Sequence, residues 1–363
     1  MYFIKPEGIG KLLLLLISYL SCLVTYAVGM SCMDNSNNPV DWFIGYKLPG
    51  HVNVPKNSMM YLDANSPSWI LVRSTLDQKH QAIFYTLDEI YSTNQYHGTS
   101  EEKFMYAMYN DEPPNSKKTY SNYGHTKGVV SFDLTSGFWL VQSKPLFPPT
   151  RASGYKWSND NTSFGQTFLC VTMPTQYLDE IGMQLMYNHP VIYDKSMPAT
   201  FADKYPKMTA ALENATVQGK SETTLYSREN VKFQSFAKSG KWGHDLYADL
   251  LASTFRDSMY VETWQRRKSK MCSNCTGTFK VFNVKKVMFS NPRVDFEETK
   301  DHAKWAITTN PAWVCVGDIN REESQMKRGG GAVCFQNKQV WSSFNDSISD
   351  WQDCSDHDRC VPP

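Results

Sequence analysis

Short runs in which apolar and polar residues alternate occur along much of the chain, and this period of two is typical of β-strands with one buried face. The runs that we expect to form strands lie at residues 129–134, 138–143, 167–173, 231–236, 259–264, 278–289 and 313–319. Only Thr135-Ser136-Gly137 separates the first two runs, which predicts a tight hairpin turn between them.

One segment follows a helical period instead. Between residues 245 and 255, Leu246, Leu250 and Leu251 fall on one face, and Asp245 stands where an N-cap residue is expected. We therefore predict an amphipathic helix here, with its leucine face buried.

Strands and helices alternate in both parts of the chain, which predicts a mixed α/β (α+β) fold. A polar stretch at residues 214–220 contains a glycine and a glycosylation sequon, and it separates segments with structured patterns. We expect one half at residues 30–213 and another at residues 214–363.

The N-terminus has the pattern of a targeting segment rather than of a folded element. Two lysines precede an apolar run at residues 12–24, and small residues precede a cleavage point after Gly29, so we predict a signal peptide over residues 1–29. A retained membrane anchor is the alternative, but the run is short for a membrane span. No later apolar stretch approaches that length, so we expect a mature protein outside the membrane, secreted or lysosomal.

A similar hairpin occurs once in each half. In the first, His125-Thr-Lys127 leads into two strands, and Ser143 lies 18 residues after His125. In the second, His302-Ala-Lys304 leads into two strands, and Asn320 lies 18 residues after His302. We interpret the pair as a duplicated unit with pseudo-twofold symmetry.

The net charge of the chain depends strongly on pH through its histidines. The formal net charge of the chain is +1 at pH 7, and removal of the signal leaves about zero, so the mature protein binds a polyanion poorly at neutral pH. All eight histidines follow residue 29, and their full protonation would bring the charge to about +8. Acid would therefore switch on attraction to a polyanion.

Cysteines and sequons both indicate the secretory pathway. Eight cysteines remain after the signal, an even number that predicts disulfides in a secreted chain. Asn-x-Ser/Thr sequons stand at Asn161, Asn214, Asn274 and Asn345, and we expect glycosylation there. Zinc binding at Cys272 and Cys275 is the weaker alternative, because no second Cys-x-x-Cys pair accompanies them.

The two His-x-Lys motifs carry the candidate chemistry. At the start of a strand, residues two apart project from the same face, so each motif presents an imidazole and an ammonium together. Phosphodiester cleavage needs this combination: one imidazole attacks phosphorus, the lysines neutralise the non-bridging oxygens, and the second imidazole protonates the leaving oxygen. A single motif would be weak evidence, but two motifs in matched hairpins predict catalytic roles for His125, Lys127, His302 and Lys304.

Longer segments resemble the deoxyribonuclease II family over residues 32–354. The segments that carry this resemblance are Pro39-Val-Asp-Trp-Phe-Ile-Gly-Tyr-Lys-Leu-Pro49, Tyr109-Asn-Asp-Glu-Pro-Pro114, Gly124-His-Thr-Lys-Gly128, Phe164-Gly-Gln-Thr-Phe-Leu-Cys170, Phe233-Gln-Ser-Phe-Ala-Lys238, Asp301-His-Ala-Lys-Trp305, Val314-Cys-Val-Gly-Asp-Ile-Asn320 and Arg328-Gly-Gly-Gly331. Together these motifs are highly specific.

The resemblance implies a phospholipase D-like fold with two similar halves and the active site between them. It implies a lysosomal or secreted enzyme that cuts double-stranded DNA in acid, without a metal ion or other cofactor, and leaves 3′-phosphate and 5′-hydroxyl ends through a phosphohistidine. Substrate-binding roles follow for Asp318, Asn320 and Ser143, where Asp318 replaces a serine of the phospholipase D pattern. Enzymes of that kind generally attack with the first histidine, which favours His125 without deciding the matter.

The disulfide pairing is likewise implied by the resemblance. It pairs Cys32 with Cys170, Cys275 with Cys354, and Cys315 with Cys334. Cys272 and Cys360 look additional to the family pattern, and we expect them to pair with each other.

One departure from the family supports a rival hypothesis. Many members have a histidine where Gln142 stands, so a secreted protein that binds DNA or a host component without turnover is the alternative. Retention of both lysines beside both histidines favours an active enzyme. A metal-dependent phosphoesterase would need a cluster of carboxylates and histidines that the sequence does not offer. Whether the chain forms a homodimer is left open.

Overall fold

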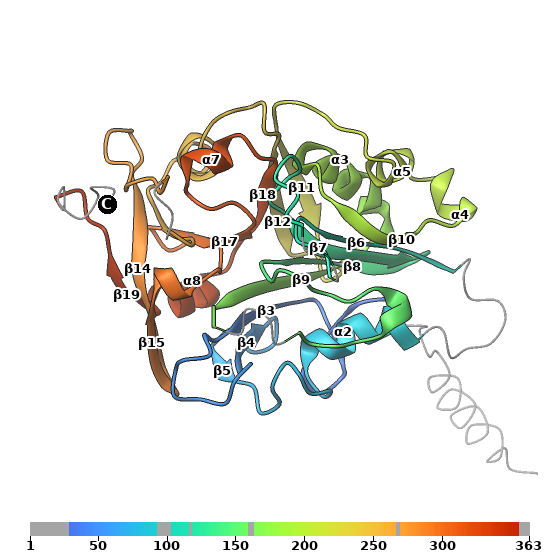
Figure 1. The fold of residues 1–363 in the computed structure, drawn as a ribbon, viewed down its shortest axis with the longest axis horizontal. Coiled ribbons are helices and arrows are strands. Elements are labelled where there is room, and N and C mark those ends of the chain that lie inside the picture. The colour runs from blue at the N-terminus through green and yellow to red at the C-terminus, as the bar shows by residue number, and fades with distance from the viewer. Residues whose placement is uncertain are drawn as a thin grey trace, which may run out of the picture.

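Two large β-sheets, a small two-stranded sheet and the helices around them form the fold in a computed structural model that describes residues 29–92, 103–114, 116, 118–158, 163–265 and 269–355 (Figure 1). Strands and helices are mixed along the chain, so the predicted mixed α/β class is confirmed. The predicted signal peptide lies outside the described residues except for its last residue, Gly29. Within the described residues, no helix is long and apolar enough to cross a membrane.

The first sheet has eight strands in the order β10-β6-β7-β8-β9-β3-β4-β5. Its strands are β3 (Trp42–Lys47), β4 (Met59–Asp63), β5 (Ile70–Leu71), β6 (Phe104–Asn110), β7 (Lys127–Asp133), β8 (Ser136–Gln142), β9 (Gln166–Pro174) and β10 (Ile192–Ser196). All of its neighbouring strands pair antiparallel. A small separate sheet pairs β1 (Cys32–Met33) with β2 (Pro39–Val40).

The second sheet has nine strands, in the order β11-β12-β18-β17-β16-β13-β14-β15 with β19 also pairing with β14. Its strands are β11 (Lys220–Tyr226), β12 (Lys232–Lys238), β13 (Met259–Glu262), β14 (Val281–Ser290), β15 (Arg293–Glu297), β16 (Trp305–Thr308), β17 (Trp313–Gly317), β18 (Gly330–Gln336) and β19 (Ile348–Trp351). The pairing of β13 with β14 is parallel.

Helices cover both faces of the first sheet. In Figure 1, α2 (Ala82–Tyr91) and α3 (Leu178–Asn188) lie on opposite sides of β6 to β9. The remaining helices are short: η2 (Arg151–Ser153), η3 (Thr175–Tyr177), α4 (Ala199–Ala202), α5 (Pro206–Leu212), the π-helix η4 (Leu246–Ala252), α6 (Ser253–Phe255), η5 (Glu298–Lys300), α7 (Glu323–Met326) and α8 (Lys338–Asn345). The largest buried apolar cluster combines inward-facing side chains of both sheets, such as Tyr46, Trp139 and Trp305, with those of α3, α5 and α8. Burial of this shared apolar surface holds the two sheets together.

The predicted elements form at nearly the expected places. The first hairpin is β7 and β8, and the second is β16 and β17. Asp245 caps the predicted helix by accepting a hydrogen bond from the Tyr247 N–H, but the helix is of the π type up to Ala252 before one α-helical turn. β14 begins at Val281, three residues later than expected, and residues 278–280 lie outside the strand.

Three disulfides join described residues, with the pairing that the resemblance implied: Cys32–Cys170, Cys275–Cys354 and Cys315–Cys334. Cys272 is disulfide-bonded as well, whereas its predicted partner Cys360 lies outside the described residues. Of the sequon asparagines, Asn214 is exposed, Asn274 and Asn345 are half-buried, and Asn161 lies outside the described residues. Glycosylation at these four positions stays a prediction, as do the two predicted halves.

Candidate active site

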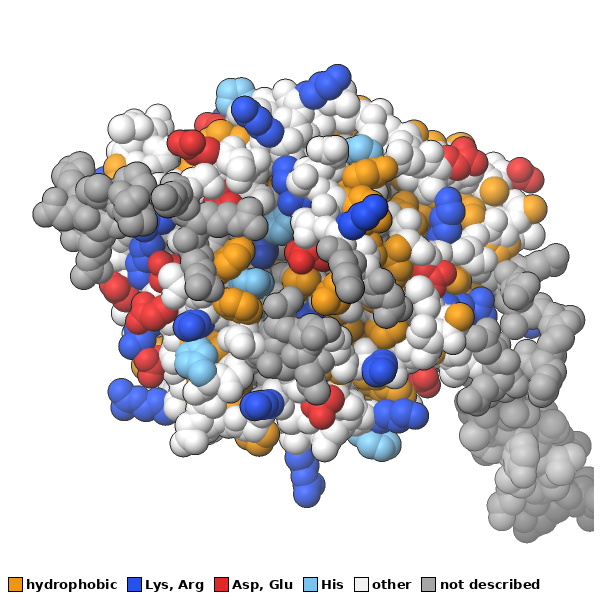
Figure 2. All heavy atoms as spheres, viewed as in Figure 1, with side chains coloured by type: hydrophobic (Ala, Val, Ile, Leu, Met, Phe, Trp, Pro, Cys, Tyr) orange, Lys and Arg blue, Asp and Glu red, His pale blue; other side chains and the backbone are white. Residues whose placement is uncertain are grey.

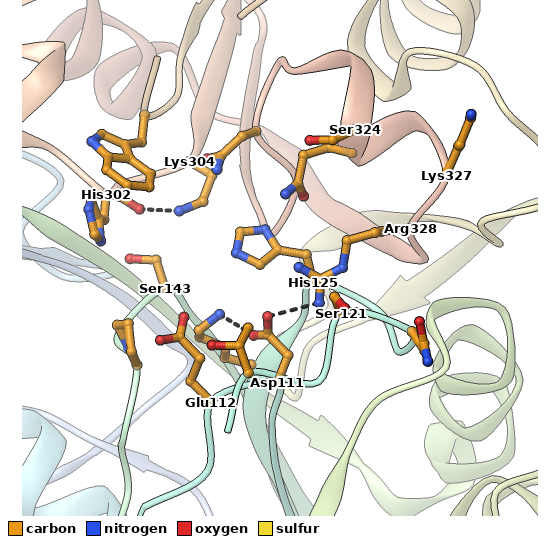
Figure 3. A pocket seen from close by; sticks show the side chains of 17 residues that line it. Asp111, Glu112, Ser121, His125, Ser143, His302, Lys304, Ser324, Lys327 and Arg328 are labelled. Atoms are coloured by element: carbon orange, nitrogen blue, oxygen red, sulfur yellow. Dashed lines mark hydrogen bonds and ion pairs between the residues drawn. The ribbon is translucent and has the colours of Figure 1, made fainter. Parts of the chain in front are cut away.

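The histidine and the lysine of both His-x-Lys motifs line one cavity, although 177 residues separate the two histidines along the chain. The cavity has a volume of about 510 Å³ and is lined by His125, Lys127, His302 and Lys304, together with Asp111, Glu112, Thr119, Ser121, Asn122, Ser143, Pro145, Trp264, Asn320, Ser324, Gln325, Lys327 and Arg328. Figure 3 shows His125, His302 and Lys304 directed into one space. Histidine and basic side chains also gather near the middle of the face shown in Figure 2.

His125 is held by a turn that belongs to the second sheet. Its backbone N–H donates to the Gly329 carbonyl oxygen at 2.8 Å, just before β18 begins. The preceding Gly124 N–H donates to the His189 carbonyl oxygen at 2.8 Å, at the end of α3. The imidazole is half-buried, and among the described residues its buried Nδ1 has no hydrogen-bond partner.

An ion-pair chain fixes the wall beside His125. Lys127 Nζ pairs with one carboxylate oxygen of Asp111, and Arg328 Nη2 donates to the other at 2.9 Å (Figure 3). Arg328 also donates to the Tyr123 and Gly124 carbonyl oxygens, each at 3.0 Å. Burial acts to raise the pKa of Asp111, but Lys127 and Arg328 outweigh it and hold that pKa below the ordinary value. Arg328 therefore ties the loop before His125 to the second sheet.

His302 is held by the first sheet in the corresponding way. Its backbone N–H donates to the Gly165 carbonyl oxygen at 2.9 Å, just before β9 begins. The Phe164 ring stacks on the imidazole, with centroids 4.0 Å apart and planes 18° apart. The Trp264 ring lies against it as well, at 4.3 Å and 50°. Lys304 Nζ donates to the His302 carbonyl oxygen at 2.6 Å.

The surroundings of His125 disfavour its protonated form. Burial and then the neighbouring cations Lys127, Lys304 and Arg328 lower the pKa of His125 well below its ordinary value. Burial, together with Lys127, also lowers the pKa of Lys304 to about 8, which still leaves this ammonium charged in acid. The cavity thus combines an imidazole that resists protonation with cationic side chains.

A set of buried carboxyl groups lies behind the cavity lining. Burial raises the pKa of Asp301 to about 6 although the Tyr46 hydroxyl donates to it, and burial raises the pKa of Glu262 well above its ordinary value. Asp318 accepts a hydrogen bond from the Thr126 hydroxyl at 2.8 Å, and burial raises its pKa to about 7. In acid these groups are protonated, so they do not cancel the positive charge of the cavity.

Comparisons with known proteins agree on one family. The sequence model described as Deoxyribonuclease II matches residues 31–354. The chain belongs to the deoxyribonuclease II family. It is 41% identical to plancitoxin-1 of Acanthaster planci over 92% of this chain and 95% of that protein. It is 38% identical to deoxyribonuclease-2-alpha of Mus musculus, over 90% and 94% of the two chains, and 35% identical to deoxyribonuclease-2 of Caenorhabditis elegans, over 93% and 97%.

The predicted substrate-binding residues of this deoxyribonuclease II family member lie at different depths. Ser143 and Asn320 line the cavity. The Ser143 hydroxyl donates to Gln166 Oε1 at 2.6 Å, and among the described residues the buried Asn320 Oδ1 has no partner. Asp318 is not in the lining but supports Thr126 from behind.

Gln142, which departs from the family pattern, and Lys238, which ends one of the family motifs, both bond to nearby backbone. Gln142 is buried outside the cavity lining; its amide nitrogen donates to the Phe147 carbonyl oxygen at 3.0 Å, and its amide oxygen accepts from the Lys144 N–H. Lys238 is fully buried, and its ammonium donates to the carbonyl oxygens of Gln325, Met326 and Arg328. Gln142 thus holds a turn, and Lys238 supports the loop that carries Arg328.

The sequence did not single out Asp111, Phe164, Trp264 or Arg328. Three of them stand inside motifs that carry the family resemblance, which is the only signal that could have marked them. Their roles depend on contacts between segments far apart in sequence, such as Phe164 with His302. No alternation pattern reports such contacts.

The described residues contain no group of three or more His, Cys, Asp or Glu side chains placed to hold a metal ion. The cavity instead offers two imidazoles and the ammonium groups of Lys127 and Lys304. These groups can perform nucleophilic attack, proton transfer and neutralisation of an anionic phosphate.

Proposed function

We propose that the protein is an acid endodeoxyribonuclease that cuts double-stranded DNA without a metal ion and leaves 3′-phosphate and 5′-hydroxyl ends. The observation that carries this proposal is the meeting of both His-x-Lys motifs in one cavity. The names of the relatives, which include deoxyribonuclease-2-alpha and deoxyribonuclease-2, support the substrate class. Lys127 and Lys304 supply the positive charge that a metal ion would otherwise bring to the phosphate.

The reaction proceeds in two steps across the cavity. A neutral imidazole of one motif attacks phosphorus, the N–P bond forms, and the P–O5′ bond breaks with its electron pair on O5′. The protonated imidazole of the other motif gives its proton to O5′, which leaves as the 5′-hydroxyl. Water then attacks the phosphohistidine, passes a proton to the second imidazole and releases the 3′-phosphate as the N–P bond breaks.

Acid favours this reaction for two reasons. One imidazole must carry a proton while the other stays neutral, and the lowered pKa of His125 keeps one imidazole neutral below the ordinary range of histidine. Protonation of the remaining histidines adds positive charge to a nearly neutral chain and so strengthens its attraction to DNA. The optimum should therefore lie at about pH 5, and activity at pH 7 to 8 should be slight.

We also propose the phospholipase D-like arrangement of two related halves around a pseudo-twofold axis. Each histidine is preceded by a loop and followed by a lysine that opens a β-hairpin. Each histidine N–H also donates to a glycine carbonyl oxygen that precedes a strand of the other sheet. A lysosomal or extracellular site of action fits the predicted signal peptide and the disulfides.

Plasmid digestion at about pH 5 in excess chelator tests the proposal. We expect nicking and cutting by the wild-type protein, loss of at least a thousandfold in His125→Ala and in His302→Ala, and full activity in the control His51→Ala, whose side chain is exposed outside the cavity. End-labelling should find 3′-phosphate termini. Activity that disappears in chelator and returns with magnesium or zinc would contradict the proposal, and DNA binding without cleavage would favour the non-enzymatic alternative.

A further inference from the structure

The two sheets hold the two histidines through residues that occupy the same place in each sheet. In the first sheet, Lys47 ends β3 and pairs in register with Gln166, two residues after Phe164. In the second, Lys238 ends β12 and pairs in register with Gly330, two residues after Arg328. Phe164 and Arg328 are therefore equivalent positions.

The surrounding hydrogen bonds repeat at the two positions. Lys47 Nζ donates to the Phe164 carbonyl oxygen at 2.7 Å, and Lys238 Nζ donates to the Arg328 carbonyl oxygen at 2.6 Å. The next residue on each side, Gly165 or Gly329, accepts the backbone N–H of a histidine from the other motif. Because the backbone contacts match, the chief difference between the two positions is the side chain.

That difference gives the two imidazoles opposite surroundings. The Phe164 ring stacks face to face on His302, and an aromatic face attracts a cation, so this contact favours the imidazolium form. Trp264 presents a second aromatic ring to the same imidazole. Arg328 instead brings a permanent positive charge near His125, which disfavours a second proton there.

We propose that Phe164 and Arg328 are positioning residues that decide which histidine attacks: Arg328 keeps His125 neutral as the nucleophile, and Phe164 keeps His302 protonated as the proton donor. The inference rests on the proposed nuclease function and on the attack by the first histidine that the family resemblance implies, and it adds the two residues that set these roles.

Other charged groups around the two rings leave this contrast in place. Burial, Lys127 and Lys304 lower the pKa of His125 more than Arg328 does, and His302 lowers it further in the same direction. Near His302, Lys304 donates to the backbone oxygen, and the neighbouring carboxyl group of Asp301 is bonded to Tyr46 and to the Ala303 N–H. The raised pKa of Asp301, about 6 through burial, leaves that carboxyl group mainly protonated at pH 5.

A diester with a good leaving group separates the two roles. Thymidine 3′-(4-nitrophenyl phosphate) releases nitrophenolate, which needs no protonation, in place of the 5′-hydroxyl. At pH 5 in chelator, His302→Ala should release one equivalent of nitrophenolate per enzyme in a burst and then stall, with the phosphoryl group on His125. His125→Ala should release none. Alkaline quenching followed by peptide mass spectrometry locates the phosphohistidine, and His302→Gln repeats the test should His302→Ala disturb the aromatic packing.

The pH profile of kcat/KM on DNA tests the two positioning residues themselves. Phe164→Leu should move the alkaline limb about half a pH unit towards acid, whereas Phe164→Tyr, which keeps the aromatic face, should leave it in place. Arg328→Gln should move the acid limb upwards by less than about one pH unit, because burial, Lys127 and Lys304 remain, whereas Arg328→Lys, which keeps the charge, should not move it. A purely structural role would lower kcat in these variants without moving either limb.

The outcomes separate this inference from the function on which it rests. If the wild-type protein cleaves neither DNA nor the nitrophenyl diester in chelator, the proposed function and this inference fall together. If the wild-type protein cleaves both, but His125→Ala gives the burst or the phosphoryl group is found on His302, only the assignment of roles is overturned. If neither limb of the kcat/KM pH profile shifts in Phe164→Leu and Arg328→Gln, these two residues have no positioning role.

Discussion

Replacement of Asp318 by asparagine should reverse part of the pH dependence of stability. Asp318 is buried behind the cavity, and burial raises its pKa from an ordinary value of 3.8 to about 7, against the opposing effects of the Thr126 hydrogen bond and Lys127. A carboxyl group with a raised pKa binds its proton more tightly in the folded state than in the unfolded state. Its contribution to stability is therefore complete below about pH 4 and is lost as the pH rises towards 7.

The expected magnitude follows from the size of this shift. One pKa unit corresponds to about 1.4 kcal/mol, so between pH 4.5 and pH 8 ionisation of Asp318 should cost the wild-type protein about 3 kcal/mol. Asp318→Asn carries no titrating proton and keeps an oxygen that can accept from Thr126. The variant should therefore gain about 3 kcal/mol on the wild type over this range, whatever its stability at pH 4.5.

Urea unfolding with the disulfides intact, followed by tryptophan fluorescence at several pH values, measures this difference. Asp295→Asn is the control, because Lys286 holds the pKa of this exposed carboxyl group low; this variant should not gain on the wild type as the pH rises. Free energies of unfolding that stay parallel for Asp318→Asn and the wild type, within about 0.5 kcal/mol, would refute the argument from burial.

Three further predictions concern the site and its support. In plasmid cleavage, the double variant His125→Ala/His302→Ala should be little worse than either single variant, because the two imidazoles act as a unit; multiplicative losses would contradict this. Lys127→Met should lower kcat and also reduce the free energy of unfolding by about 1 to 3 kcal/mol in urea titrations, because Lys127 is buried and Asp111 loses its ion pair. Gln142→Ala should reduce the free energy of unfolding by about 1 to 2 kcal/mol, because Gln142 holds a turn outside the cavity lining. KM for DNA should stay within about twofold of the wild-type value. A large change in KM with normal stability would instead indicate a role in the active site.

The sequence predicted the hairpins well because each has a local cause. In β7 and β8, residues buried in the apolar clusters on the two sides of the sheet alternate, and Leu134 and Thr135 connect the strands, one residue before the expected turn Thr135-Ser136-Gly137. The strands β3, β4 and β6 are buried on both faces as β7 and β8 are, but no tight turn joins any of them to its neighbour in sequence, so they gave no comparable signal. The spacing of the leucines could not predict that η4 is a π-helix, because the same leucines face the core in either helix type.

The candidate site was predictable in its motifs but not in its surroundings. The repeated spacing marked His125 and His302, and the structure brings both to one cavity. Lys127 and Lys304, pictured from the motif as projecting groups, are almost fully buried. The residues that distinguish one imidazole from the other, Arg328 and Phe164, depend on the register of strands in two different sheets, which no local pattern contains.

The exchange of supporting turns between the sheets also concerns how the protein is made. Each histidine is hydrogen-bonded to a glycine more than 100 residues away, so neither imidazole is held in place until both sheets have formed and packed together. A chain still emerging from the ribosome has the first motif but not Gly329, and it therefore has no assembled cavity. The cavity can therefore be assembled only from a chain that extends through Gly329 and only when both sheets are packed together.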